Sequence, residues 1–265
     1  MTDYVVQQNG RAVTVEDLAP LAFAGYAHFT AMQVRDRRVR GLDLHLARLH
    51  AASTEMFGRT LAEDRVRSYL RAAVRAGRPD VSLTAIVYSA PGEFTATEGE
   101  LRMLVRTSPP ASGPSGPLTL ATIEHERFLP AVKHVGETAK TYALRRAVGT
   151  GFDDAAFVDR QGRFSEATIW NLAFWDGTAV LWPEAQMLIG TTMGIVRRQL
   201  DRLGVPQRVE AITPADVPSL SGAVVMNSWT PGIAVHRIGT APLPPAPKFV
   251  DLLHRAYGSE PLTEF

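Results

Sequence analysis

The chain has 265 residues, of which 45% are hydrophobic, enough for a sizeable core in one large domain or two smaller ones. Its 28 basic and 27 acidic residues nearly cancel, so we expect neither a nucleic-acid binder nor a binder of anionic membranes. The absence of cysteine excludes disulfides, iron–sulfur clusters and cysteine-based zinc sites. No apolar run approaches the roughly 18 residues of a membrane span. Residues 1–4 lack the features of a secretory signal, so we expect a cytoplasmic protein.

The first half predicts a mixture of strands and helices. Asn9-Gly10 between two β-type segments is typical of a type I′ hairpin turn. Apolar residues recur at helical spacing further on, and Gly58 and Gly77 follow as helix stops. The expected elements are a hairpin over residues 4–8 and 12–14, helices over 42–57 and 62–76, and strands over 81–88 and 101–106.

Residues 107–117 divide the sequence. This segment contains four prolines and two glycines, which sustain neither a helix nor a strand ladder. We therefore expect an N-terminal domain over residues 1–108, an interdomain linker over 109–117 and a larger domain over 118–265. The alternative is a long surface loop within one domain.

The second half predicts a β-rich unit with inserted helices. Turns are expected at residues 160–163 and at Asp176-Gly177, which is typical of a hairpin. The expected strands are 118–124, 155–159, 164–166, 172–175, 179–182 and 223–227, and the expected helices are 137–148, 190–203 and 247–257. The fold class is therefore α+β in two parts, and a ligand cleft is expected at their junction.

Lysine is rare in this chain. Only Lys133, Lys140 and Lys248 are lysines, and arginine cannot form the imines that lysine forms, so imine chemistry has three candidate positions. Lys133 follows a short apolar stretch before a predicted helix, where its amine could enter a cleft. The alternative is a solvated surface lysine.

Three further segments carry candidate chemistry. Glu166 closes a strand-like run, where a carboxylate could keep a pyridine nitrogen protonated; otherwise it is a solvent-facing hairpin residue. The Gly190-Thr191-Thr192 segment enters a helix, whose free N–H groups suit a phosphate; otherwise it is an ordinary threonine N-cap. Residues 227–233 form a polar turn after a buried strand, which could offer Ser228 to the same phosphate or be a plain turn.

In chain order, these segments resemble the fingerprint of the class IV aminotransferase family. The family has a lysine, a Gly-x-Asp-[Asp/Glu]-Ala strand, Asp-x-x-Gly-x-x-x-Glu, an Asn-Leu/Ile pair, Leu-x-Gly-x-Thr at a helix start and a late Asn-Ser or Gly-Thr turn. A His-x-x-Arg-Leu helix lies near the N-terminus. The matching residues here are Lys133, Gly151–Ala155, Asp159–Glu166, Asn171-Leu172, Leu188–Thr192, Asn227-Ser228 and His45–Leu49.

The resemblance implies a two-domain, fold type IV enzyme that uses pyridoxal 5′-phosphate. The small N-terminal domain would be α/β and the larger C-terminal domain β-rich with helices, and family members are usually homodimers. Lys133 would form the Schiff base and move protons, and Glu166 would hold the pyridine nitrogen. The other expected cofactor-binding residues, most of them at the phosphate, are Arg48, Asn171, Gly190, Thr191, Thr192 and Ser228.

Lys140 is the rival for the Schiff base. It lies about one turn into the predicted helix, and it is too close to Asp153 for the family spacing, so the resemblance favours Lys133.

The chain departs from the family pattern at several positions. Gly136-Glu137-Thr138 replace a nearby asparagine, Met193 replaces a common arginine, and Thr30 stands where an acid is usual. These changes concern substrate specificity. Tyr26, His28 and Trp229 are the candidate substrate contacts, with a packed His–aromatic cluster as the alternative for the first two.

The function that the resemblance implies is amino-group transfer between an amino acid or amine and a 2-oxo acid, with these small molecules as the expected partners. The alternative is a lyase similar to aminodeoxychorismate lyase, which eliminates pyruvate; Lys133-His134 and Asn227-Ser228 lean toward it. A second alternative is a cofactor-free scaffold that binds a small ligand. The seven scattered histidines and the absence of a His-Glu-x-x-His motif predict no metal site.

Overall fold

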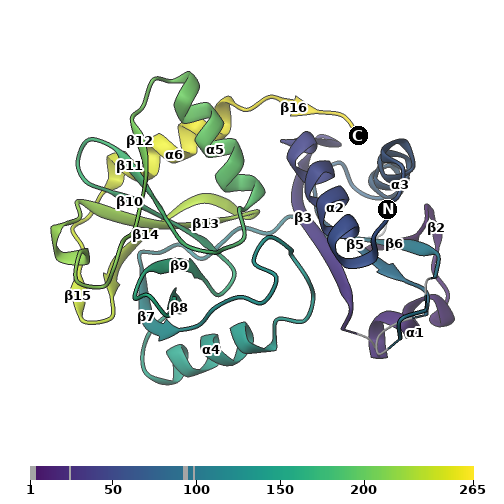
Figure 1. Ribbon diagram of the computed structural model, residues 1–265. Coiled ribbons are helices and arrows are strands. Elements are labelled where there is room, and N and C mark those ends of the chain that lie inside the picture. The colour runs from purple at the N-terminus through teal and green to yellow at the C-terminus, as the bar shows by residue number, and fades with distance from the viewer. Residues whose placement is uncertain (1–3, 24, 92–94, 98) are drawn as a thin grey trace. The chain divides into compact units, whose positions relative to one another are not determined.

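The computed structural model describes residues 4–23, 25–91, 95–97 and 99–265, and it divides into two compact units (Figure 1). Unit 1 comprises Met1–Ala111, Val132–Gly136 and Pro261–Phe265. Unit 2 comprises Ser112–Ala131 and Glu137–Glu260. Residues 109–117, all of them described, contain neither helix nor strand. No helix among the described residues has the length and apolarity needed to cross a membrane.

Unit 1 contains an antiparallel sheet of seven strands in the order β16-β4-β3-β5-β6-β1-β2. Its strands are β1 (Val5–Gln8), β2 (Arg11–Ala12), β3 (Ala27–Arg35), β4 (Arg38–Arg40), β5 (Val81–Ser89), β6 (Leu101–Ser108) and β16 (Leu262–Thr263). Its helices are α1 (Val15–Phe23), α2 (Leu42–Phe57) and α3 (Glu63–Ala76).

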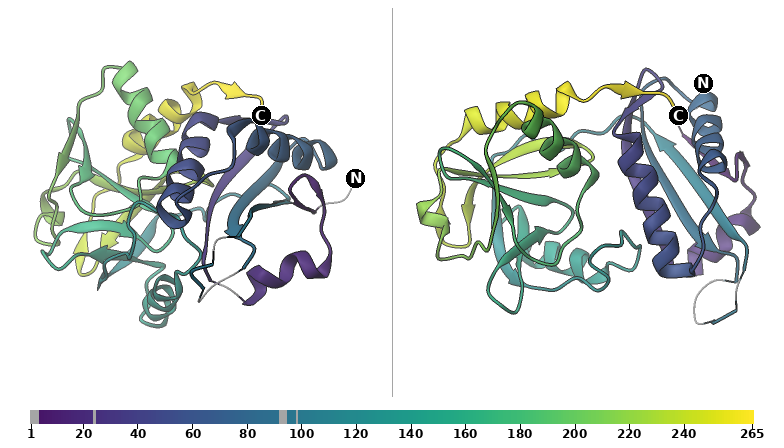
Figure 2. Two further views of the ribbon diagram at one scale, coloured as in Figure 1. Left: turned by 45° about the vertical axis from the view of Figure 1, so that its right-hand side comes forward. Right: turned by 45° about the horizontal axis from the view of Figure 1, so that its top comes forward.

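Helices α2 and α3 cover one face of this sheet (Figure 2). The pattern follows from the two periods of the sequence: helical spacing aligns Leu46, Leu49 and Leu70, and strand alternation aligns Met32 and Val34 beneath them. All five side chains are almost completely buried. Burial of apolar surface at about 25 cal/mol per Å² is therefore what fixes the helices on this face.

The predicted hairpin and the first two predicted helices are confirmed. Asn9 and Gly10 both have positive φ angles, of 49° and 78°, as a type I′ turn requires. Gly58 ends α2 in the left-handed conformation with φ of 66°, where a side chain would be strained.

Unit 2 contains a nine-stranded sheet in the order β12-β11-β10-β13-β14-β7-β8-β9, with β15 paired to β14. A further pairing of β9 with β10 closes part of this sheet on itself. The strands are β7 (Leu118–Glu124), β8 (Asp154–Val158), β9 (Phe164–Ala167), β10 (Asn171–Trp175), β11 (Val180–Pro183), β12 (Gln207–Glu210), β13 (Gly222–Asn227), β14 (Thr230–Ile238) and β15 (Ala241–Pro242). The helices are α4 (Thr138–Gly149), α5 (Thr191–Arg202), the short 3-10 helix η1 (Val217–Ser219) and α6 (Pro247–Ser259).

Strand β10 shows how unit 2 buries both faces of its sheet. Leu172 and Phe174 point into one apolar cluster, within the closed part of the sheet. Ala173 points the other way, into a second cluster with Val196 of α5 and Leu253 of α6. A strand buried on both faces has a nearly continuous apolar sequence, as β10 has. The strands and helices predicted for this half are confirmed to within one or two residues at most ends.

Candidate functional site

The site is built where β9 meets β10. Glu166 of β9 and Asn171 of β10 are the paired residues that join these two strands. The turn between the strands is held by the buried carboxylate of Asp154, which accepts hydrogen bonds from Thr168 Oγ1 at 2.6 Å and Trp170 Nε1 at 2.8 Å. Hydrogen bonds to a buried charged acceptor are stronger than neutral ones, so the turn is firmly fixed. These hydrogen bonds therefore fix the positions of Glu166 and Asn171.

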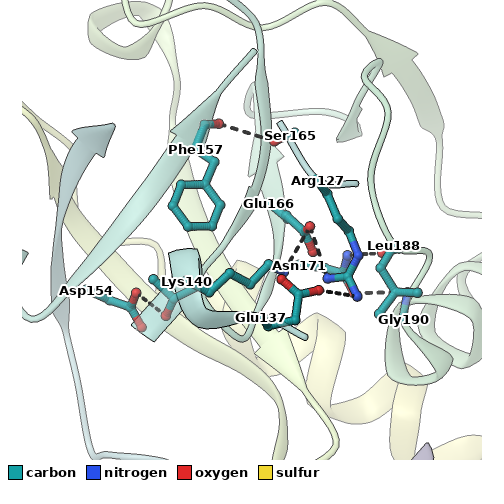
Figure 3. A network of polar contacts seen from close by, with 11 residues as sticks. Arg127, Glu137, Lys140, Asp154, Phe157, Ser165, Glu166, Asn171, Leu188 and Gly190 are labelled. Carbon is teal, nitrogen blue, oxygen red and sulfur yellow. Dashed lines mark hydrogen bonds and ion pairs between the residues drawn. The ribbon is translucent and has the colours of Figure 1, made fainter. Parts of the chain in front are cut away.

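Asn171 links this strand pair to the start of α5 (Figure 3). Its Nδ2 donates to the Leu188 carbonyl at 2.6 Å, and its Oδ1 accepts from the Gly190 N–H at 3.1 Å. A Cβ atom on Gly190 would lie 2.0 Å from Asn171 Oδ1, so only glycine permits this approach. The side chain of Asn171 thus determines where α5 begins.

The first turn of α5 has the features of an anion-binding site. Gly190 is its N-cap, and no side chain in the described part of the chain caps it with a hydrogen bond. The first N–H groups of a helix have no partner within the helix, and the helix dipole favours negative charge there. Thr191 and Thr192 are buried beside these groups. This arrangement suits a phosphate.

Glu166 lies within a buried network of charges (Figure 3). Its Oε1 is 3.0 Å from Lys140 Nζ and 3.5 Å from Arg127 Nη1, and Arg127 Nη2 is 2.6 Å from Glu137 Oε1. The side chains of Arg127, Lys140 and Glu166 are only 3%, 8% and 6% exposed. Two carboxylates therefore alternate with two cations, and only Glu137 is partly exposed. Such pairing is how buried charges are tolerated.

Burial lowers the pKa of the Lys140 amine, and the positive charge of Arg127 lowers it further, while Glu166 and Glu137 act in the opposite direction. His125 lies nearby, with its ring centroid 4.6 Å from that of Phe157. Burial is also the main cause that lowers the pKa of His125. The environment around Glu166 thus disfavours the protonated, positively charged forms of Lys140 and His125.

Neither Arg127 nor Glu137 was predicted as a site residue, and the sequence pattern favoured Lys133 over Lys140. A signal for Lys140 was nevertheless present. Lys140, Ala143 and Ala147 follow helical spacing, and all three are buried on one face of α4. A lysine in an alanine stripe of this kind indicates an amine that is packed into the protein.

Ser228 and Trp229 form the turn between β13 and β14. Trp229 N–H donates to Asn227 Oδ1 at 2.8 Å, and Asn227 Nδ2 donates to the Ile169 carbonyl at 3.4 Å. The Trp229 ring contacts Trp170 edge to face, with 5.7 Å between the centroids. Through Ile169 and Trp170 this turn therefore touches the β9–β10 connection that carries Glu166 and Asn171.

The remaining predicted site residues belong to unit 1. The main chain at Lys133 continues the sheet beside β3, because the Phe29 N–H donates to the Lys133 carbonyl at 2.8 Å. Lys133 Nζ lies 4.7 Å from the centroid of the Phe29 ring, a cation–π contact. Arg48 lies on α2, one turn after the buried His45.

Tyr26 and His28 pack against α2. His28 is fully buried, its Nε2 lies 2.8 Å from Ser53 Oγ, and its ring is 5.8 Å from that of Phe57. The Tyr26 hydroxyl donates to the Met56 carbonyl at 2.7 Å. The packed His–aromatic cluster considered as an alternative is therefore present, and contact of either residue with a substrate stays a prediction.

The residues of unit 2 fit a phosphorylated pyridine. The buried carboxylate of Glu166 is a suitable partner for a protonated ring nitrogen, although Lys140 and Arg127 already contact its Oε1. At the other end, the glycine entrance of α5 provides N–H groups for the phosphate. Asn171 contacts the α5 entrance and pairs with Glu166, so both ends are held by one strand junction. The fold and these residues therefore fit an enzyme that binds a phosphorylated ring cofactor.

Comparison with protein families agrees with this class. The family model for amino-transferase class IV matches residues 27–238, and the chain belongs to that family. It is accordingly a pyridoxal-phosphate-dependent enzyme with an α+β fold of type IV. The family, fold class, enzyme class and cofactor predicted from the sequence are thus confirmed.

Solved structures share the fold across nearly the whole chain. A branched-chain aminotransferase from Thermoproteus uzoniensis with norvaline has a TM-score of 0.84 at 19% identity, covering 97% of this chain and 98% of that one. A putative 4-amino-4-deoxychorismate lyase from Legionella pneumophila has a TM-score of 0.82 at 18% identity, with coverages of 94% and 96%. A PLP-bound hypothetical aminotransferase from Mycobacterium tuberculosis has a TM-score of 0.81 at 21% identity, with coverages of 97% and 99%. No curated protein sequence matches the chain.

Proposed function

We propose that this enzyme transfers an amino group between an amino acid or amine and a 2-oxo acid, and that Lys133 is the residue that binds the cofactor covalently. The observation that carries the proposal is the connection from Glu166 through Asn171 to Gly190, which holds a buried carboxylate and a helix N-terminus in one rigid frame. Bound pyridoxal phosphate supplies an aldehyde and an electron-withdrawing ring, and both ends of that ring find partners in this frame.

Each residue of the frame has a distinct task. Glu166 holds a proton at the ring nitrogen, which a carboxylate in a buried site does well. The N–H and hydroxyl groups of Thr191 and Thr192 bind the phosphate, together with Ser228 and Arg48. The Lys133 amine would act as the general base that moves the proton of the substrate Cα.

The position of Lys140 supports Lys133 as the covalent attachment. In the pyridine ring the aldehyde group stands opposite the nitrogen, so the amine that reacts with it must lie away from the carboxylate that holds the nitrogen. Lys140 Nζ is 3.0 Å from Glu166 Oε1, beside the wrong end of the ring. Lys248 is exposed on α6, so Lys133 is the lysine left for this task.

The substrates of this proposal are a small amino donor and a small carbonyl acceptor. The chain is expected to act as a homodimer, as related enzymes usually do. Size-exclusion chromatography with light scattering tests the dimer independently of activity.

A second candidate is elimination of pyruvate, as an aminodeoxychorismate lyase performs it. The Lys133-His134 and Asn227-Ser228 pairs favour it, and a putative lyase is among the proteins of the same fold. The two reactions differ in what they leave behind. Transfer converts the cofactor to its amine form in a single turnover, whereas elimination returns the aldehyde form and releases pyruvate.

The experiment has two stages. Borohydride reduction of the cofactor-loaded protein followed by peptide mapping is expected to find the cofactor on Lys133, and the Lys133→Ala variant is expected to lose this label while Lys248→Ala keeps it. Single-turnover assays with a panel of amino acids then separate transfer from elimination by mass analysis of the extracted cofactor. Protein that takes up no cofactor would contradict the proposal, and a label on Lys140 would overturn the assignment of Lys133.

A further inference from the structure

Lys140 has no task in the proposed reaction, although it is one of the most deeply placed charges in unit 2. Its amine is 3.0 Å from Glu166 Oε1, and both side chains are nearly excluded from water. That distance is typical of an N–H···O contact to a carboxylate. The Lys140 ammonium thus makes, within this chain, the contact with Glu166 that a protonated ring nitrogen would make.

The charges around Glu166 balance without any further cation. Glu137, Arg127, Glu166 and Lys140 form a row of alternating sign whose sum is zero. A protonated ring nitrogen at Glu166 adds a third cation beside one carboxylate group. Like charges in a buried site repel strongly, so one of the two resident cations has to withdraw or lose its charge.

Arg127 is not the cation that yields. A guanidinium cannot give up its proton in a protein, and Arg127 is also engaged by Glu137 at 2.6 Å. Lys140 differs in both respects. Its amine can lose a proton to water, burial and Arg127 already lower its pKa, and its flexible side chain has a single ion-pair partner among the described residues.

We propose that Lys140 is an exchangeable cation of the cofactor site, whose ammonium neutralises Glu166 in the empty enzyme and gives up that carboxylate when the cofactor binds. The inference rests on the proposed role of Glu166 as the partner of the ring nitrogen. In the exchange the Lys140 N–H···Glu166 contact breaks and the Lys140 proton passes to solvent. Lys140 thus stabilises the empty enzyme and lowers its affinity for the cofactor.

Three variants test the exchange, and each is measured for cofactor affinity and for the melting temperature of the empty protein. Lys140→Met removes the competing charge and should tighten pyridoxal phosphate binding by about tenfold, while the empty protein melts at a lower temperature because Glu166 loses a partner. Lys140→Arg keeps a cation that cannot lose its proton, so it should weaken binding by about tenfold. Lys248→Met is the matched control at an exposed site and should change neither quantity.

Lys140→Met and Lys140→Arg should change cofactor affinity in opposite directions, and this distinguishes the exchange from a purely structural role of Lys140. If Lys140 only supports the fold, Lys140→Met weakens cofactor binding and Lys140→Arg restores it, which overturns the inference. Lys140→Gln, of nearly the same length, repeats the test should the methionine variant fail to fold. Failure of the proposed function is seen separately, because the unmodified enzyme would then take up no cofactor.

Discussion

Glu166 and Asn171 face each other at the pairing that closes the sheet of unit 2, so one strand junction holds both a buried carboxylate and the amide that fixes the start of α5. Neither residue reaches this place by local preference. Asp154 holds the turn between them, and the paired strands supply the spacing. The chemistry of the site thus depends on a tertiary closure, and substitutions around that closure test it.

Gly190→Ala should impair the phosphate seat. The backbone angles of Gly190, φ −64° and ψ 145°, suit alanine, so the effect comes from the new Cβ, which would lie 2.0 Å from Asn171 Oδ1. Asn171 or the α5 entrance must move, at a cost of about 1–3 kcal/mol. We expect pyridoxal phosphate affinity to fall roughly tenfold in a fluorescence titration.

Gly258→Ala is the control, because a Cβ there meets no atom within 4 Å and Gly258 lies within α6. It should bind the cofactor as the unmodified chain does and be slightly more stable, since alanine favours a helix. If Gly190→Ala and Gly258→Ala bound the cofactor with equal affinity, the start of α5 would not be part of the phosphate site.

Asp154→Asn should loosen the β9–β10 turn. Both carboxylate oxygens of Asp154 accept hydrogen bonds, from Thr168 Oγ1 and Trp170 Nε1, and an amide group offers only one acceptor oxygen. The loss should destabilise unit 2 by about 1–3 kcal/mol and shift the emission of Trp170. Urea unfolding followed by tryptophan fluorescence measures both, with Asp251→Asn, exposed on α6, as the control.

Most elements of unit 2 could be predicted because each has a local signal, such as the Asp176-Gly177 turn. Strand β3 was missed for a physical reason. Its core-facing positions include His28 and Thr30, which break the apolar alternation. His28 Nε2 and Thr30 Oγ1 form hydrogen bonds with Ser53 and His45 of α2. A strand whose buried polar groups are paired across space has no such signature in its own sequence.

The site was predictable to a similar extent. Glu166 and the Gly190 entrance were selected in advance, and the structure links them through Asn171. The contacts of Arg127 with Glu137 and Glu166 arise only when segments distant in sequence meet, so no spacing predicts them. The pairing of the Lys133 segment with β3 is non-local in the same way.

Unit 1 should lose stability in mild acid because of its buried histidines. Burial lowers the pKa of His28 to about 4 and that of His45 to about 3, whereas an unfolded chain binds these protons near pH 6.5. Between pH 6.5 and 4 the unfolded state therefore holds more protons, so stability falls as the pH falls. For His28 the loss is at most about 3 kcal/mol.

Thermal melts across this pH window, with histidine NMR shifts, measure the effect. His28→Gln should flatten the dependence on pH, while His50→Gln, exposed on α2, should leave it unchanged. A His28 resonance that titrates near pH 6.5 in the folded protein would refute the explanation.

Glu260→Ala should lower the stability of α5 without affecting cofactor binding at the first turn of that helix. Glu260 is nearly buried after α6, and its carboxylate accepts hydrogen bonds from Arg198 Nε at 2.9 Å and from Gln199 on the last turns of α5. Removing this shared acceptor should destabilise unit 2 by about 3 kcal/mol, as for a broken buried ion pair. The first turn is held separately, by Asn171 at Gly190. Folded Glu260→Ala protein should therefore bind pyridoxal phosphate with unchanged affinity, unlike Gly190→Ala.

Urea unfolding with a parallel cofactor titration measures both quantities. Glu184→Ala, exposed after β11, is the control. If Glu260→Ala lost cofactor affinity along with stability, the two ends of α5 would act as one unit.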